Sequence, residues 1–275
     1  MVPLWQEWRH ILSRIEGARH LLLLSDYDGT LTPIASRPEL AVIPPPIKEL
    51  LSRLAAWEGG TGAVVSGRAL EDVRALIGIE GLYYAGNHGL QIAGPGFSWV
   101  HPEAGATKPL LEDLAQELSA RLGEVRGVIV ENKGLTLTVH YRMVAPEVAG
   151  RVGAVFEAAV EPMRAQGKLR VTRGKMVYEV RPPVDWDKGK AVDYLVTKTQ
   201  EVQGTREVLP FYLGDDLTDE AGFRAVRERE GVSIFVSGGD HESGASYSVD
   251  SVGEVQRFLG LLLEAGQGPT RPPPA

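Results

Sequence analysis

The sequence predicts an α/β protein whose parallel sheet is interrupted by a small α+β segment. Over residues 4–89, short apolar runs alternate with amphipathic helical patterns, which is typical of βαβ units. In the middle of the chain, two hairpin-like strand pairs each follow a helical pattern. After Pro182 and Pro183 the strand–helix alternation returns. The predicted architecture is therefore a Rossmann-like parallel-sheet core with an inserted αββαββ layer.

The first part of the core is predicted from three apolar runs, each beside a helical pattern. Helices are expected over 4–16, 46–57 and 69–76, and strands over 20–25, 62–65 and 82–85. In the first helix, Trp8, Ile11 and Ile15 recur at the spacing of one helical face. The run 21–24 (LLLL) is bounded by a turn signal, which indicates a fully buried strand.

The inserted layer is predicted from two helices and two hairpins. Helices are expected over 108–122 and 146–166, and strands over 127–131, 136–141, 169–172 and 176–180. The strands are joined by two turn signals, 132–134 (NKG) and 173–175 (RGK). We place this layer at 104–183.

The last part of the chain completes the core. Helices are expected over 188–199, 221–229 and 252–263, and strands over 208–213 and 233–236. The core therefore comprises 1–103 and 184–265. The tail 266–275 is rich in glycine and proline, so we expect it to be disordered.

Composition argues against several functional classes. The 275 residues carry a formal net charge of −7, which disfavours nucleic acid or an anionic membrane as a partner. Cysteine is absent, which excludes disulfides, a thiol nucleophile and Cys-ligated zinc. No stretch approaches the roughly twenty apolar residues of a membrane span, and the N-terminus has no signal-like apolar core. We therefore expect a cytoplasmic monomer that acts on a small molecule.

Acidic side chains follow two of the predicted strands. Asp26 and Asp28 come directly after the strand 20–25, and the segment 214–220 (GDDLTDE) follows the strand 208–213. Ligands of open α/β sheets bind at the carboxyl ends of strands, so these acids can converge on one ion. The ligand set is carboxylate oxygen without His or Cys, which favours Mg²⁺. The alternative for the second cluster is a solvated first turn of a helix, where Asp is favoured by capping.

The spacing of the first pair also predicts a reaction. An oxygen of Asp26 is placed to attack phosphorus, and carboxylate nucleophiles that form aspartyl phosphates are an established class. Asp28, two residues on, is placed to protonate the leaving oxygen and then to activate water.

Four segments together resemble the haloacid dehalogenase superfamily of phosphatases. They are 26–31 (DYDGTL), Ser66 after the second strand, Lys188 before a helix, and 214–216 (GDD). The resemblance implies that Asp26 is the nucleophile and a Mg²⁺ ligand, and that Asp28 is the general acid/base and binds Mg²⁺ through its main-chain carbonyl. Further implied roles are phosphoryl hydrogen bonding for Ser66, charge neutralisation for Lys188, metal ligation for Asp215, and supporting or alternative metal ligation for Asp216 and Asp219. Taken singly, Ser66 is more simply a turn residue and Lys188 a surface lysine.

A second set of segments resembles the trehalose-6-phosphate phosphatase family. The segments are 66–68 (SGR), 86–89 (GNHG), 131–134 (ENKG), 140–142 (HYR) and 174–182 (GKMVYEVRP). The inserted layer then corresponds to a cap domain, and the resemblance implies substrate-binding roles for Arg68, Asn87, His88, Glu131, Lys133, Arg142, Lys175 and Glu179. For Arg181 and Tyr141 we favour structural roles. One departure is Gln91, which stands where an acid is more usual.

The leading hypothesis is a Mg²⁺-dependent hydrolase that converts trehalose 6-phosphate to trehalose and phosphate, the last step of trehalose biosynthesis. A phosphatase for another sugar phosphate or for glycosyl-3-phosphoglycerate is the close alternative. A phosphate-transferring mutase and a non-catalytic regulator that binds the ligand or a trehalose-phosphate synthase are the other classes. Such a synthase is the partner that the resemblance suggests.

Overall fold

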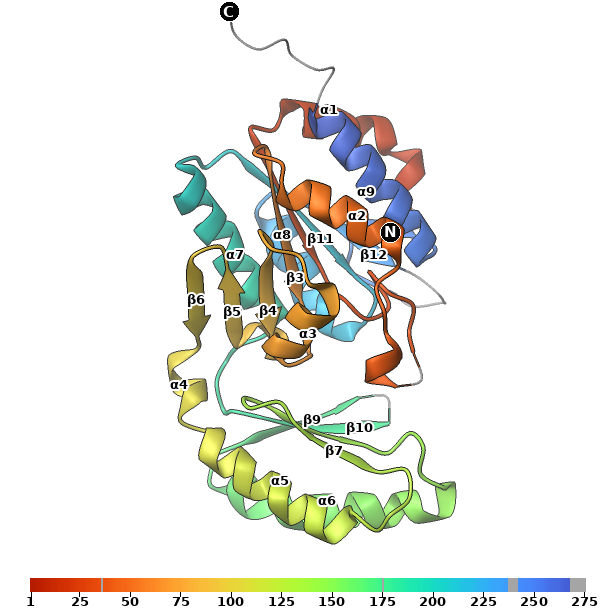
Figure 1. The fold of residues 1–275 in the computed structure, drawn as a ribbon, viewed down its shortest axis with the longest axis vertical. Helices are drawn as coiled ribbons and strands as arrows, with labels where there is room; N and C mark the ends of the chain where they lie inside the picture. Colours follow the sequence, from red (N-terminus) through yellow and green to blue (C-terminus); the bar gives the residue numbers. More distant parts are fainter. Residues whose placement is uncertain (36, 175, 237–241, 268–275) are drawn as a thin grey trace, which may run out of the picture. The chain divides into compact units, whose positions relative to one another are not determined.

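The computed structural model describes residues 1–35, 37–174, 176–236 and 242–267. The chain forms two compact units (Figure 1). The first contains Met1–Ser98 and Trp186–Ala275, and the second contains Trp99–Asp185. The predicted insertion at 104–183 falls inside the second unit, which also takes in a few residues on either side.

The first unit is built on a mostly parallel sheet. Within the described residues its strand order is β1 (Val2–Pro3), β13 (Tyr247–Val249), β12 (Val232–Val236), β11 (Val208–Gly214), β2 (His20–Ser25), β3 (Gly60–Val65), β4 (Tyr83–Gly86), β5 (Gln91–Gly94) and β6 (Phe97–Val100). Pairing is parallel from β1 to β4, and β5 joins β4 antiparallel. The chain builds outward from β2 in one direction and from β11 in the other. The boundary between β2 and β11 is therefore the topological switch point, where ligands of such sheets bind.

Helices cover both faces of this sheet. They are α1 (Trp8–Gly17), α2 (Pro45–Ala55), α3 (Leu70–Ile77), α7 (Lys188–Gln203), α8 (Glu220–Glu228) and α9 (Val252–Gln267), with 3-10 turns η1 (Leu4–Gln6), η2 (Pro38–Leu40), η3 (Asn87–Gly89) and η4 (Leu217–Asp219). Figure 1 shows α2 and α1 lying along α9, while α7 packs on α8. Leu21 and Leu23 belong to the core that contains Ile11 and Phe258. Leu22 and Leu24 alternate to the other face and are also buried, which confirms the fully buried strand.

Several predicted elements differ from the structure in extent. The helix expected over 4–16 is divided at Glu7, whose backbone (φ −106°, ψ 13°) leaves the helical range between η1 and α1. The hairpin β5–β6 was not predicted, because its strands are only four residues long and β6 alternates in exposure. The helix expected over 252–263 continues to Gln267 as α9, two residues into the expected tail. Residues 268–275 lie outside the described residues.

The second unit confirms the predicted αββαββ order. Its helices are α4 (Pro102–Gly105), α5 (Lys108–Leu122) and α6 (Pro146–Ala165), and its antiparallel sheet has the order β7 (Ile129–Asn132), β8 (Leu137–His140), β10 (Val177–Arg181) and β9 (Arg170–Gly174). Its own core joins Leu114 of α5 and Phe156 of α6 to Leu137, Val139 and Val180 of the sheet. Both long helices therefore lie on one face of the sheet. The opposite face carries the polar residues Glu131, Thr138 and Glu179 beside the apolar Ile129 and Val177.

Of the helices that the structure describes, none combines the length and the apolar character that crossing a membrane requires.

Candidate active site at the carboxyl ends of two parallel strands

The site forms where β2 and β11 end side by side. Ser25 is paired in register with Leu213, and the Asp26 amide donates a hydrogen bond to the Leu213 carbonyl at 2.8 Å. Asp26 is therefore held at the switch point by the sheet ladder itself. Asp26 is only 6% exposed, so a negative charge on its carboxylate must be stabilised by partners inside the protein.

A glycine turn brings the second acidic segment against the first. Gly29 has a positive φ of 82°, and a Cβ at this position would lie 2.1 Å from Oδ2 of Asp215. The next residue, Thr30, donates from its hydroxyl to Oδ1 of Asp215 at 3.2 Å. Glycine is thus required both for the backbone conformation and for the close approach of Asp215.

Three carboxylates gather around this point. Asp26, Asp215 and Asp219 each offer an oxygen, and these oxygens all lie within 4.8 Å of one another. The ammonium group of Lys188 reaches into the same cluster, with Nζ 3.1 Å from Oδ1 of Asp26 and 2.8 Å from Oδ1 of Asp219. Lys188 is the first residue of α7 and is fixed there because the preceding Asp187 caps the helix. Its side chain is 3% exposed, so it is a buried cation and not a surface lysine.

Asp219 is an anchor within the cluster. Its Oδ1 accepts from Lys188 Nζ and from the Tyr212 hydroxyl, and its Oδ2 accepts from the amides of Asp215 and Asp216. A carboxylate has about four lone-pair sites, and these four hydrogen bonds use that capacity. Asp26 and Asp215 are therefore the two clustered carboxylates with room for another partner.

The cluster holds more negative charge than Lys188 can balance. Burial raises the pKa of Asp26 well above its usual value, although the neighbouring Lys188 lowers it. Burial and the nearby Asp219 raise the pKa of Asp215 to about 7. Burial alone would lower the pKa of Lys188, but its acidic neighbours outweigh burial and raise it, so this lysine stays charged. An added cation would offset the like charges that help to raise these carboxyl pKa values.

Asp216 has a different place from the other acids. Its Oδ1 accepts from the amide and the hydroxyl of Thr218, and it forms a capping box with Asp219 at the start of η4. The residue is exposed. Against the desolvating effect of the protein around its carboxylate, Lys188 and the hydrogen bonds from Thr218 lower the pKa of Asp216. The first-turn role that the sequence left open for this acidic segment thus describes Asp216, whereas Asp215 joins the buried cluster.

Asp28 and Ser66 lie at the same edge of the sheet. Both oxygens of Asp28 are engaged by Arg68, with Nε at 2.7 Å from Oδ2 and Nη2 at 2.6 Å from Oδ1. Ser66 follows β3, is 1% exposed, and its Oγ accepts from the Arg68 amide at 3.2 Å. The SGR segment therefore links the end of β3 to the acid that follows β2.

Asn87 and His88 follow β4 in two consecutive left-handed backbone conformations, with φ of 51° and 57°. The His88 amide donates to the Ser66 carbonyl, and the Asn87 amide donates to the Arg68 carbonyl. Asn87 is fully buried, and its Nδ2 donates to Oε1 of Gln91 at 3.1 Å. In this chain Gln91, the departure noted in the sequence, therefore serves as the partner of Asn87.

Two predicted sugar-binding residues of the second unit, Glu131 and Glu179, share one face of its sheet. Glu131, Thr138, Glu179 and Thr172 are register partners across all four strands, on the face opposite α5 and α6. Glu131 accepts from His140 Nε2 at 2.8 Å and lies 3.9 Å from Lys133 Nζ. Glu179 is paired with Arg181 at 2.6 Å. The hydroxyl oxygen of Thr138, between the two glutamates, is buried and has no hydrogen-bond partner among the described residues.

The remaining predicted residues of the second unit are placed as follows. Arg142 is exposed in the turn after β8. Lys175 lies outside the described residues. Tyr141 stacks on Tyr178 with ring centroids 4.8 Å apart, which agrees with the structural role expected for it. Arg181, also expected to be structural, is the partner of Glu179.

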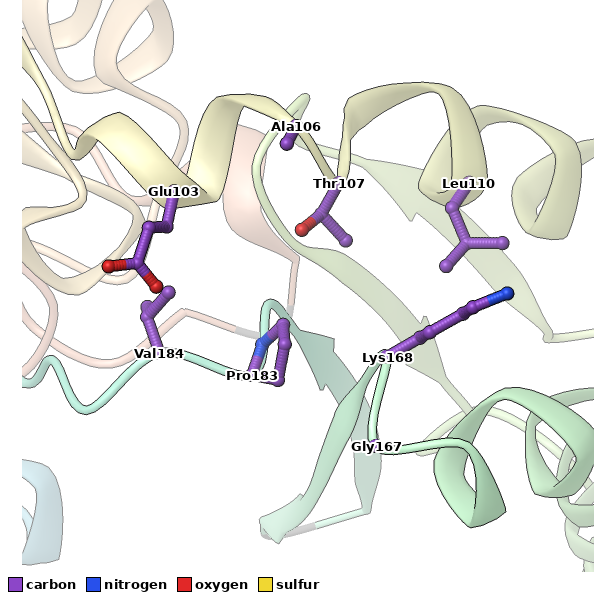
Figure 2. Close-up of a pocket in the computed structure, with 8 residues that line it drawn as sticks. All are labelled: Glu103, Ala106, Thr107, Leu110, Gly167, Lys168, Pro183 and Val184. Atoms are coloured by element: carbon purple, nitrogen blue, oxygen red, sulfur yellow. The ribbon is translucent and has the colours of Figure 1, made fainter.

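A separate pocket of about 340 Å³ lies within the second unit. Figure 2 shows the residues that line it: Glu103, Ala106, Thr107, Leu110, Gly167, Lys168, Pro183 and Val184. None of the predicted site residues is among them. The candidate active site is therefore formed by the strand-end acids and does not include this pocket.

Sequence reasoning missed two side chains that shape the acidic cluster. Thr30 belongs to the first motif, but its bond to Asp215 spans 185 positions of sequence and is not visible in the pattern. Tyr212 is a fully buried aromatic residue in the middle of β11, and its sequence context is that of a core residue. Only the fold brings its hydroxyl to Asp219, at 2.6 Å.

The comparisons with known proteins identify relatives of this chain. The trehalose-phosphatase family model matches residues 24–253. Trehalose 6-phosphate phosphatase RA3 of Zea mays is 35% identical over 93% of this chain and 73% of its own length. Among solved structures, the C-terminal domain of the Candida albicans trehalose-6-phosphate phosphatase superposes with a TM-score of 0.76 at 24% identity, over 93% of this chain and 96% of that one.

A haloacid dehalogenase-like hydrolase from Bacteroides thetaiotaomicron also superposes, with a TM-score of 0.59 at 18% identity over 88% of this chain and 99% of that one. It supports the fold alone. The α/β core with a mostly parallel sheet is therefore haloacid dehalogenase-like, and the separate antiparallel sheet fits a cap domain. Because the family model covers most of its length, the chain belongs to the trehalose-phosphatase family.

Proposed function

We propose that this protein hydrolyses trehalose 6-phosphate to trehalose and inorganic phosphate. The observation that carries the proposal is the buried cluster of Asp26, Asp215 and Lys188 at the switch point of the sheet. It joins a carboxylate nucleophile to a fixed cation at one strand end, in a chain of the trehalose-phosphatase family. The identity of the sugar is inferred from the names of the related proteins, which are trehalose-phosphate phosphatases.

The donor set fits a divalent hard cation. The clustered ligand atoms are all carboxylate oxygens, and burial with like charges raises the pKa of both Asp26 and Asp215. Mg²⁺ prefers such oxygens and pairs with substrate phosphate. We assign Asp26, Asp215 and the main-chain carbonyl of Asp28 as its protein ligands. Asp219 anchors them, and Asp216 supports the cluster from its capping position. When bound, the ion supplies positive charge for the transferring phosphoryl group.

The first half of the reaction is a transfer to Asp26. A carboxylate oxygen of Asp26 attacks phosphorus, and the bond from phosphorus to the sugar oxygen breaks. Asp28 gives a proton to the departing oxygen, which leaves as the sugar hydroxyl. Lys188 stays protonated beside Asp26 and offsets charge on the phosphoryl oxygens, and Ser66 donates a hydrogen bond to one of them.

The second half releases phosphate. Water attacks phosphorus of the aspartyl phosphate, and Asp28, now a carboxylate, takes the proton of that water. The bond from phosphorus to Asp26 breaks, which regenerates the Asp26 carboxylate and leaves Asp28 protonated for the next cycle. The buried position of Asp26 limits access of bulk water to this intermediate.

In this proposal the cap sheet determines which sugar the enzyme accepts. Its polar face pairs acids with bases, as in Glu131 with Lys133 and Glu179 with Arg181. Such pairs offer both acceptors and donors, which the hydroxyl groups of a disaccharide require. We assign Glu131, Lys133, Arg142, Lys175 and Glu179 to the sugar. We also assign Asn87 and His88 of the core to substrate binding.

A panel of sugar phosphates tests the proposal. Phosphate release is measured from trehalose 6-phosphate, glucose 6-phosphate and a glycosyl-3-phosphoglycerate, each with Mg²⁺ and with a chelator. We expect the highest kcat/KM for trehalose 6-phosphate and loss of turnover when the chelator is present. A higher kcat/KM for another ester would mean that this ester is the substrate, while the proposed reaction steps would stand. Phosphate release that requires a second sugar as acceptor would indicate a mutase, and no release from any ester would indicate a regulator.

A further inference from the structure

Arg68 makes a two-pronged contact with the proposed general acid. Its Nε and Nη2 reach the two oxygens of Asp28 at 2.7 and 2.6 Å, which is the fork geometry of a bidentate arginine–carboxylate pair. Such a pair fixes the plane of the carboxylate as well as its distance. The Asp28 side chain therefore has one orientation at the end of β2.

Arg68 itself is held on several sides. Its guanidinium carbon lies 5.3 Å from the ring centroid of Tyr27, a cation–π contact with a residue that is fully buried. Its amide donates to Ser66 Oγ, and its carbonyl accepts from the Asn87 amide at 2.7 Å. Contacts therefore hold Arg68 in place both at its backbone and at its guanidinium group.

The two partners differ in exposure. The Arg68 side chain is 13% exposed, whereas that of Asp28 is 42% exposed. Arg68 is therefore the more enclosed member of the pair, and Asp28 is the member that solvent and ligands can reach. A carboxylate has about four lone-pair sites, and the fork occupies two of them, so the outward side of Asp28 keeps sites for a proton.

We propose that Arg68 is a positioning residue for proton transfer: it orients Asp28 toward the departing oxygen and acts through Asp28 instead of contacting the sugar. The inference rests on the proposed function, because it needs Asp28 to be the general acid. It replaces the sugar-binding role that the family resemblance suggested for Arg68.

Leaving-group dependence tests this role. A sugar oxygen needs a proton to depart, whereas the phenol of p-nitrophenyl phosphate departs without one. Release of the alcohol or phenol in a single turnover isolates the first step from hydrolysis of the aspartyl phosphate. In Arg68→Gln we expect this rate to fall about 100-fold for trehalose 6-phosphate and less than about fivefold for the aryl ester, within the range for general acids. KM for the sugar phosphate stays within about twofold.

A double variant and a matched control complete the test. Arg68→Gln should slow Asp28→Asn no further, because both changes remove the same proton transfer. Arg229→Gln breaks another arginine–aspartate pair, between Arg229 Nε and Asp193 Oδ1 at 2.6 Å, and should leave both rates unchanged. Equal losses on both esters in Arg68→Gln, a rise in KM alone, or additive losses in the double variant would overturn the proposal. A wild-type protein inactive on every ester would instead overturn the proposed function.

Discussion

The acids at the strand ends of the core and the acids on the cap sheet differ in how completely they are enclosed. Asp219 in the core is 0% exposed and accepts four hydrogen bonds from fixed donors. Glu131 in the cap has a side chain that is 29% exposed and shares one oxygen between His140 and Lys133. A buried, fully partnered network allows one arrangement, whereas pairs on an open sheet face can exchange protein partners for ligand hydroxyls.

This contrast assigns different tasks to the two units. Phosphoryl transfer needs in-line positioning and preorganised charge, and the proposed function gives this task to the core cluster. Discrimination between sugars needs donors and acceptors that become available on binding, and the proposed function gives this task to the polar face of the cap sheet. Variants in the core should therefore remove chemistry for every ester, and variants in the cap should remove preference for the disaccharide.

The largest effect is expected from Asp26→Asn. The amide cannot attack phosphorus, so turnover of both trehalose 6-phosphate and an aryl phosphate should fall by about 1,000-fold or more. Asparagine has nearly the same size, so the thermal unfolding midpoint should stay within a few degrees of that of the wild type. The measurement is phosphate release on both esters, with circular dichroism to follow unfolding. Retention of about a tenth of the activity would contradict the role of Asp26 as nucleophile.

A selective effect is expected from Glu179→Ala or Lys133→Ala in the cap. Loss of a charged hydrogen-bond partner for the sugar should lower kcat/KM for trehalose 6-phosphate by about 10- to 100-fold. Hydrolysis of p-nitrophenyl phosphate, which has no sugar, should change little. Glu157→Ala is the matched control, because Glu157 is an ion-paired glutamate of α6, which packs on the other face of the cap sheet. Equal losses on both esters would make Glu179 and Lys133 structural residues.

The charge excess of the core cluster should appear as an unusual pH dependence of stability. The pKa of Asp215 is raised from its ordinary 3.8 to about 7, so the folded protein binds this proton more tightly than the unfolded chain. This group therefore stabilises the fold fully below about pH 4, and its contribution is lost as the pH rises to about 7. With a chelator present to remove metal ions, we expect the free energy of unfolding to fall by on the order of 2 kcal/mol across that pH range.

Two comparisons isolate the contribution of Asp215. Urea unfolding at pH 5 and pH 8 is measured for the wild type and for Asp215→Asn, and the difference between their slopes with pH is the quantity of interest. Asparagine does not titrate, so the decline should be less steep in the variant, in which Asp26, whose pKa is also raised, still contributes. Mg²⁺ should restore stability at pH 8 in the wild type only. Matching pH slopes in the two proteins would show that Asp215 does not carry the excess charge.

The parts of this molecule that could be predicted from sequence are those with a local signal. The strand 20–25 is an apolar run with a turn after it, and the acids that follow are set by the chain itself. β5 and β6 lack such a signal, because they are short and partly exposed. The bonds from Thr30 to Asp215 and from Tyr212 to Asp219 depend on how strands pack. The pairing of Asp28 with Arg68 joins two predicted site residues in a contact that neither motif indicates.

The smallest effect is expected from Tyr212→Phe, which tests how rigid the core cluster is. The change removes the hydroxyl that donates to Asp219 Oδ1 and leaves the buried ring in place. The cost of one buried hydrogen bond to a charged group is about 1–3 kcal/mol in unfolding free energy. Three of the four donors to Asp219 remain, so kcat should fall by less than about tenfold while KM for trehalose 6-phosphate is unchanged.

Tyr84→Phe is a control, because the Tyr84 hydroxyl donates to the Ile79 carbonyl, a neutral acceptor away from the acids. Loss of this hydroxyl should cost stability without lowering kcat. If Tyr212→Phe lowers kcat as strongly as Asp26→Asn, then Tyr212 takes part in the reaction and the anchor described for Asp219 is incomplete. If it changes neither stability nor kcat, the enclosure of the core acids does not depend on this bond, and the contrast with the open pairs of the cap is weaker than the geometry indicates.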